Sequence, residues 1–135
     1  MQGGCYCGEV RYEIDAKPIM KGQCHCRECQ YIAGGAPNYF MVVPEDGFRI
    51  TQGEPRAFAR KDLEKPRTRH FCDTCGTHLT TRRFEGGVVI VKVGTLDDPA
   101  KDFRDSAVAI FMKDNQPFHL VADGKPCFEE LPPLK

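Results

Sequence analysis

The sequence predicts a mainly β fold of antiparallel strands in a single domain, residues 1–135. Short segments rich in β-branched and aromatic residues alternate along the chain with turns of glycine and proline. Helical periodicity is nearly absent, which indicates an all-β class. A chain of 135 residues is long enough to bury a core of its own, and no repeat or long linker divides it.

The first predicted strand, residues 8–14, alternates in polarity: Val10, Tyr12 and Ile14 face one side, and charged residues face the other. The other predicted strands combine β-favouring residues with flanking turn signals; they are residues 18–24, 38–43, 48–51, 56–60, 68–72, 77–83, 88–93, 107–112 and 118–121.

Helical structure is predicted in only two places. Residues 27–33 fit one short helix, which the glycines at 34 and 35 stop. Residues 96–99 fit a turn with N-cap character. Three late prolines mark an irregular tail.

Charge and hydropathy narrow the possible partners. Lysine plus arginine equals aspartate plus glutamate, 19 each, so net charge gives no support to a nucleic-acid or membrane partner. The N-terminus lacks the features of a signal peptide, and the longest apolar run, 88–93, is interrupted by Lys92. We therefore expect a cytoplasmic protein, in which eight cysteines serve as metal ligands or reactive thiols rather than disulfides.

Four cysteines form two distant pairs. Cys72 and Cys75 are separated by two residues, so both sulfurs can reach one metal ion at about 2.3 Å, and Gly76 suits a turn with positive φ. Cys5 and Cys7, if extended, point to the same face. Together they predict a closed, structural zinc site. The alternatives are metal-free reduced pairs or a redox C-x-x-C, although the βαβ context of redox motifs is missing.

Cys24, Cys26 and Cys29 form a second group, spaced C-x-C-x-x-C. We expect them to hold a second zinc ion with three thiolates and one free position, as in catalytic sites. Because such sites lose metal readily, partial occupancy is expected. His25 should point away from its neighbours and is a poor fourth ligand. Water, a substrate or Cys127 could fill the position, but a free thiol is favoured for Cys127.

A zinc ion with three thiolates carries a net charge of −1 and is a weak Lewis acid. It suits a soft fourth ligand, such as a substrate sulfur, whose pKa it lowers. The remaining titratable groups give weaker signals. We expect packing or surface roles for His70, His78 and His119, and a mainly solvated face for the arginines that could otherwise bind a carboxylate, namely Arg60, Arg67, Arg69, Arg82 and Arg83.

Four stretches, which follow one another in a known family's order and spacing, carry a resemblance to that family: residues 3–12, 24–29, 71–77 and 94–99. In them the chain resembles the glutathione-dependent formaldehyde-activating enzymes, a zinc family related to the centromere protein V group. The resemblance implies a β-tent fold of antiparallel sheets around the zinc sites. The chain departs from the family in having no tryptophan, which the family usually carries near residues 116–118.

The resemblance also implies the ligands and the activity. The structural zinc would be held by Cys5, Cys7, Cys72 and Cys75, and the catalytic zinc by Cys24, Cys26 and Cys29. The implied activity is that of a carbon–sulfur lyase, which condenses glutathione with formaldehyde. Two other hypotheses remain: a zinc-scaffolded module that binds protein or nucleic acid without catalysis, and a carrier of metal or thiol without turnover.

Overall fold

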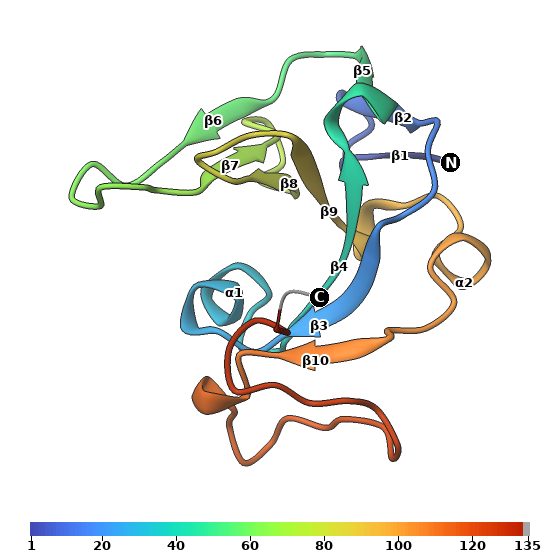
Figure 1. Cartoon of the computed structure of the whole chain (residues 1–135). Coiled ribbons are helices and arrows are strands. Elements are labelled where there is room, and N and C mark those ends of the chain that lie inside the picture. The colour runs from blue at the N-terminus through green and yellow to red at the C-terminus, as the bar shows by residue number, and fades with distance from the viewer. Residues whose placement is uncertain (134–135) are drawn as a thin grey trace.

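Two β-sheets form the body of the molecule in the computed structural model, which describes residues 1–133 (Figure 1). The strands are β1 (Gln2–Gly4), β2 (Arg11–Ile14), β3 (Met20–Cys24), β4 (Asn38–Pro44), β5 (Phe48–Gln52), β6 (Arg56–Phe58), β7 (Thr68–Phe71), β8 (His78–Arg82), β9 (Val88–Lys92) and β10 (Val108–Ile110). The helices are short: α1 (Arg27–Ile32), α2 (Pro99–Asp102) and the 3-10 turns η1 (Glu45–Gly47), η2 (Val93–Thr95) and η3 (Met112–Asp114). The predicted mainly β class is confirmed.

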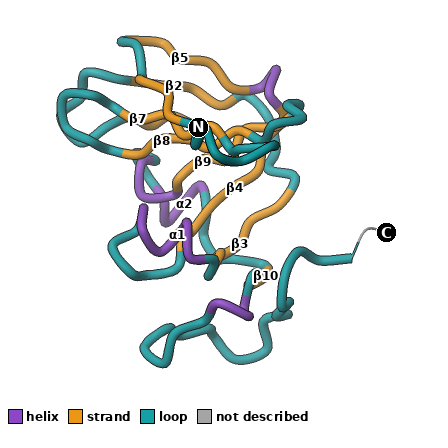
Figure 2. Tube along the Cα trace, turned by 90° about the vertical axis from the view of Figure 1, so that its left-hand side faces the viewer, coloured by secondary structure: helices purple, strands orange, loops and turns teal. Residues whose placement is uncertain are grey.

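The larger sheet has the strand order β10-β3-β4-β9-β8-β7-β6, and the smaller has the order β1-β2-β5. Strands β2 and β5 lie at the opposite end of the molecule from β10 (Figure 2). The prediction of purely antiparallel sheets is wrong in one place, because β10 pairs with β3 in parallel. The turn η2 and helix α2 carry the chain from β9 to the free edge of β3, so no hairpin imposes antiparallel pairing there.

One expected strand does not form, and one strand that forms was not expected. Residues 118–121 do not form a strand; the N–H of His119 instead donates to the carbonyl of Gln116 in a turn, and both Phe118 and Leu120 are exposed. Strand β1 was not predicted because its two glycines have low β propensity. Glycine is needed at Gly3, since a Cβ there would lie 2.3 Å from the carbonyl oxygen of Thr95.

The larger sheet separates two apolar clusters. Alternate residues of β4 and β9 face opposite sides, as expected for strands. Met41, Val43, Val89 and Val91 pack in the larger cluster, which also contains Cys5 and Cys72. Phe40, Val42 and Ile90 pack on the other side, in a cluster that contains Cys24 and Cys29. The two groups of cysteines therefore belong to different halves of the core.

The structure also bears on membrane insertion. Among residues 1–133, no helix is both long and apolar enough to cross a bilayer.

Candidate metal centres

Cys5, Cys7, Cys72 and Cys75 come together, with all four Sγ atoms within 4.8 Å of one another. The Sγ atom of Cys7 lies 3.5 Å from that of Cys5 and 3.8 Å from that of Cys72. A tetrahedron with zinc–sulfur bonds of 2.3 Å places its sulfurs about 3.8 Å apart, whereas a disulfide needs about 2.05 Å. All four cysteines are free thiols. Their spacing fits a shared metal ion and does not fit disulfides.

Two glycine turns shape this four-cysteine cluster. Gly8 and Gly76 directly follow the second cysteine of each pair and have φ angles of 84° and 77°. Their N–H groups donate to the carbonyls of Cys5 and Cys72, respectively. The Cys5–Cys7 segment is not extended: it turns because it connects the antiparallel strands β1 and β2. The predicted turn at Gly76 is confirmed.

Polar hydrogens point at the sulfurs of the four-cysteine cluster. The N–H of Val10 donates to Cys5 Sγ over 3.3 Å, and the hydroxyl of Thr77 lies 3.1 Å from Cys75 Sγ. The contact with Thr77 lowers the pKa of the Cys75 thiol to about 6. The N–H of Tyr6 donates to the same Thr77 hydroxyl and so links the two turns. Donors of this kind favour thiolates, the form that binds metal.

The second group, Cys24, Cys26 and Cys29, also converges, with its Sγ atoms within 4.8 Å of one another. Cys24 is the last residue of β3, Cys26 is the N-cap of α1, and Cys29 lies in the first turn of α1. The N–H of Cys29 donates to Cys26 Sγ over 3.4 Å. Cys24 and Cys29 are buried, and Cys26 is partly exposed. A strand end and a helix start thus build this three-cysteine cluster.

The three-cysteine cluster favours a cation. The neighbouring thiols of Cys26 and Cys29 raise the pKa of Cys24, because further negative charge next to an ionised sulfur is unfavourable. The same contact with Cys24 lowers the pKa of Cys26. A divalent ion would remove this conflict, and a set of sulfur ligands suits zinc. Among residues 1–133, no fourth Cys, His, Asp or Glu joins the cluster.

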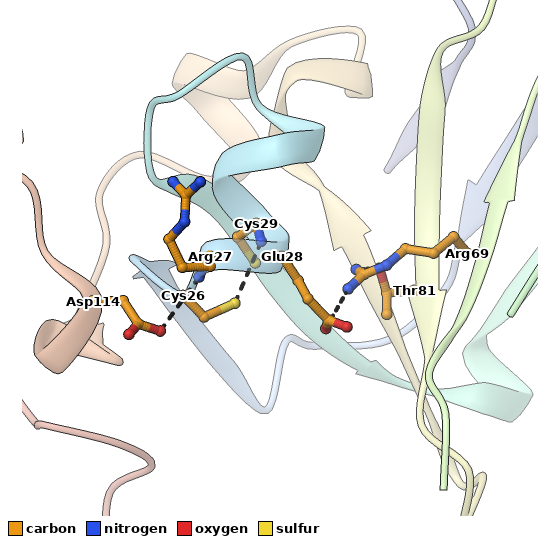
Figure 3. A network of polar contacts seen from close by, with 7 residues as sticks. All are labelled: Cys26, Arg27, Glu28, Cys29, Arg69, Thr81 and Asp114. Atoms are coloured by element: carbon orange, nitrogen blue, oxygen red, sulfur yellow. Dashed lines mark hydrogen bonds and ion pairs between the residues drawn. The ribbon is translucent and has the colours of Figure 1, made fainter. Parts of the chain in front are cut away.

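Helix α1 is held from both sides (Figure 3). On one side, Arg69 Nη2 donates to Glu28 Oε2 and Nη1 donates to Thr81 Oγ1, each over 2.9 Å. On the other, the N–H of Arg27 donates to Asp114 Oδ2 over 3.3 Å. The side chain of Arg69 is only 11% exposed, so the expected solvated face is wrong for this arginine. Its charge also lowers the pKa of Cys26, although less than the contact with Cys24 does.

His25 is fully buried, and both of its ring nitrogens have partners. Nδ1 lies 2.9 Å from Nδ1 of His119, and Nε2 lies 3.0 Å from Nε2 of Gln23. Nε2 of His119 in turn lies 2.7 Å from the carbonyl oxygen of Gly35, to which it donates. One arrangement of hydrogens satisfies this whole series of hydrogen bonds with both imidazoles neutral. His25 is therefore a packing residue with no free nitrogen for a metal, which agrees with the prediction that it is a poor fourth ligand.

The comparison with protein families covers both cysteine clusters. Residues 1–114 match the family model described as glutathione-dependent formaldehyde-activating enzyme. The chain belongs to this family. The matched region includes all seven clustered cysteines and ends before Cys127. Cys127 is exposed and lies outside both clusters, so the predicted free thiol is confirmed.

A solved structure shares the fold of this family member. It is a Northeast Structural Genomics target from Rhodobacter sphaeroides, with a TM-score of 0.61 and 17% sequence identity. The match covers 95% of this chain and 99% of that one. At this identity the likeness establishes the fold alone. No curated protein matches the sequence.

A pocket of about 380 Å³ lies between α1 and the ends of β4, β8 and β9. Its polar wall comprises Asn38, Thr77, His78, Lys92 and Thr95. Lys92 is only 6% exposed. Burial lowers the pKa of Lys92 to about 8, and the thiols of the three-cysteine cluster oppose that shift. No role was predicted for Lys92, although its place as a lysine within the apolar run 88–93 is a signal in the sequence.

Proposed function

We propose that this chain is an enzyme that joins a small thiol to formaldehyde or a related aldehyde, as a carbon–sulfur lyase working reversibly. Glutathione is the first thiol to test, because the family is named for it. The proposal rests on one observation: among residues 1–133, the sulfurs of the three-cysteine cluster converge without a fourth protein ligand, while the four-cysteine cluster forms a complete set. A metal bound by three sulfurs keeps one position for a substrate.

The two clusters have separate tasks in this proposal. Cys5, Cys7, Cys72 and Cys75 hold a structural zinc that fixes the N-terminal hairpin to the turn between β7 and β8. Cys24, Cys26 and Cys29 hold the catalytic zinc. When bound, that ion would lower the pKa of a substrate thiol and keep it ionised at neutral pH.

The reaction adds the thiol across the carbonyl group of the aldehyde and needs no further reactant. The thiolate sulfur forms a bond to the carbonyl carbon, and the π electrons of the carbonyl move to its oxygen. That oxygen takes up the proton that the thiol lost, which gives an S-hydroxymethyl product. The chain contributes placement: Arg69 and Glu28 fix α1, and the buried His25 network fixes the end of β3, so the three sulfurs keep their positions.

The test is the exchange between glutathione, formaldehyde and their adduct, followed by NMR with and without the zinc-loaded protein. We expect exchange faster than the spontaneous rate, and we expect Cys26→Ser to abolish the acceleration. Cys127→Ser is the matched control, since this thiol is exposed and lies outside both clusters. A spontaneous rate in the presence of protein with two zinc ions per chain would exclude formaldehyde and glutathione as its substrates.

A further inference from the structure

Lys92 lies on the side of the large sheet that carries the three-cysteine cluster. It is the Cα partner of Phe40 across β4 and β9, so both side chains point to the same face. Phe40 packs with Cys24 and Cys29 in the second apolar cluster. Residue Ile90, two positions before Lys92, packs against that cluster as well. The ammonium of Lys92 is therefore close to the proposed catalytic zinc site.

This ammonium forms no ion pair with an Asp or Glu side chain among residues 1–133. The ion pairs in that part of the chain use other cations, namely Arg11, Arg49, Arg56, Arg60, Arg69, Arg82, Lys113 and Lys125. At 6% exposure, Lys92 has also lost most of its contact with water. Buried lysines are rare without a partner, because desolvation of an unpaired charge is costly. The thiols of the three-cysteine cluster attract this ammonium, and the pocket gives it a second side on which an anion can bind.

Within the described part of the chain, residues 1–133, no acidic side chain lines the pocket next to Lys92. Its polar wall has neutral hydrogen-bonding groups, Asn38, Thr77, His78 and Thr95, and its other wall is mainly apolar. His78 Nδ1 is buried and has no hydrogen-bond partner among residues 1–133. Burial lowers the pKa of His78, so the imidazole is neutral at pH 7 and carries one N–H. One fixed cation with neutral hydrogen-bonding groups suits a carboxylate.

We propose that this pocket is a carboxylate site, in which Lys92 pairs with the carboxylate of the small thiol substrate. The identity of the ligand as a thiol rests on the proposed function, whereas the carboxylate site rests on Lys92 and the pocket. A volume of about 380 Å³ is at the lower end of the range for small-molecule pockets. The site would select carboxylated thiols over neutral ones and orient the sulfur toward the three cysteines.

The test compares two thiols that differ mainly in charge, 3-mercaptopropionate and 2-mercaptoethanol, by calorimetric titration of the zinc-loaded protein. We expect tighter binding of 3-mercaptopropionate, and Lys92→Met should weaken it by at least about tenfold, the loss typical of one hydrogen bond to a charged group. Binding of 2-mercaptoethanol should hardly change. Lys92→Arg should keep most of the preference. Acetate should compete with 3-mercaptopropionate on the wild-type protein.

Other results would overturn the carboxylate site. If the wild-type protein shows no preference for the carboxylated thiol, the site does not exist, whether or not Lys92→Met folds. If Lys92→Met weakens both thiols equally, or if zinc analysis shows one ion lost per chain, Lys92 only balances the charge of the cysteines. Charge-selective binding without acceleration of formaldehyde exchange would support the site and refute the proposed function.

Discussion

The two cysteine clusters differ in how the chain builds them. Two turns far apart in sequence meet to form the four-cysteine cluster, and each needs a glycine with positive φ. The three-cysteine cluster comes from one continuous segment, in which β3 ends and α1 begins. A site that joins distant segments stabilises the fold, because the metal closes a long loop. A metal site within one segment contributes little to the stability of the fold. Such a site can therefore serve to bind a ligand.

Removing one sulfur from the four-cysteine cluster is the strongest test of whether the two clusters differ in their contribution to stability. Cys72→Ser should lower the free energy of unfolding by more than about 4 kcal/mol, because the loss of a structural metal is among the most destabilising changes. Circular dichroism and thermal unfolding would measure this. A variant that folds normally with one zinc ion per chain would show that this cluster is not structural.

The matched change in the other cluster should spare the fold. Cys29→Ser should reduce thiol–formaldehyde exchange by at least about 100-fold. The loss of a metal ligand lowers metal affinity more than the loss of a group that only orients a metal ligand. Its cost in stability should be about 1–2 kcal/mol, as for an ordinary buried substitution. Exchange assays and denaturant unfolding separate the two effects, and Cys127→Ser should change neither. Equal destabilisation by Cys29→Ser and Cys72→Ser would remove the distinction between the clusters.

A chelator should remove the two metals in order. The three-cysteine cluster should release its zinc first and without loss of secondary structure, because it has fewer protein ligands. The second ion should leave together with unfolding. A zinc indicator and circular dichroism, recorded in the same titration, would show this order, and Cys26→Ser should show only the second phase. Simultaneous release would mean that the two sites are coupled.

The smallest expected effect is the loss of stability when the glycine of a turn in the four-cysteine cluster is replaced. Gly76→Ala should cost about 1–2 kcal/mol, because its φ of 77° strains a residue with a Cβ. Gly94→Ala is the matched control, since no atom lies within 4 Å of the new Cβ at either position and Gly94 does not have positive φ. Its change should stay within about 0.5 kcal/mol. Equal costs in denaturant unfolding would show that the turn conformation is not what requires glycine.

Much of the fold and of the site could be predicted from local patterns. The alternation of apolar and polar residues, together with turn residues, predicted most strands and α1, and the cysteine spacings predicted both clusters. The errors lie where distant contacts outweigh local preference. Residues 118–121 have strand-like composition, but the buried ring of His119 ties them to Gly35 and His25 in a turn. Strand β1 depends on the close approach of Thr95 to Gly3.

The sequence by itself determined the grouping of seven of the eight cysteines into one set of three and two pairs, because the spacing within each segment limits which sulfurs can meet. It also determined the mainly β class through alternating side chains. Only the tertiary structure placed the two clusters on opposite sides of one sheet and buried Lys92 beside the second. That placement depends on register between strands distant in sequence, where a shift of one residue reverses which face each side chain occupies.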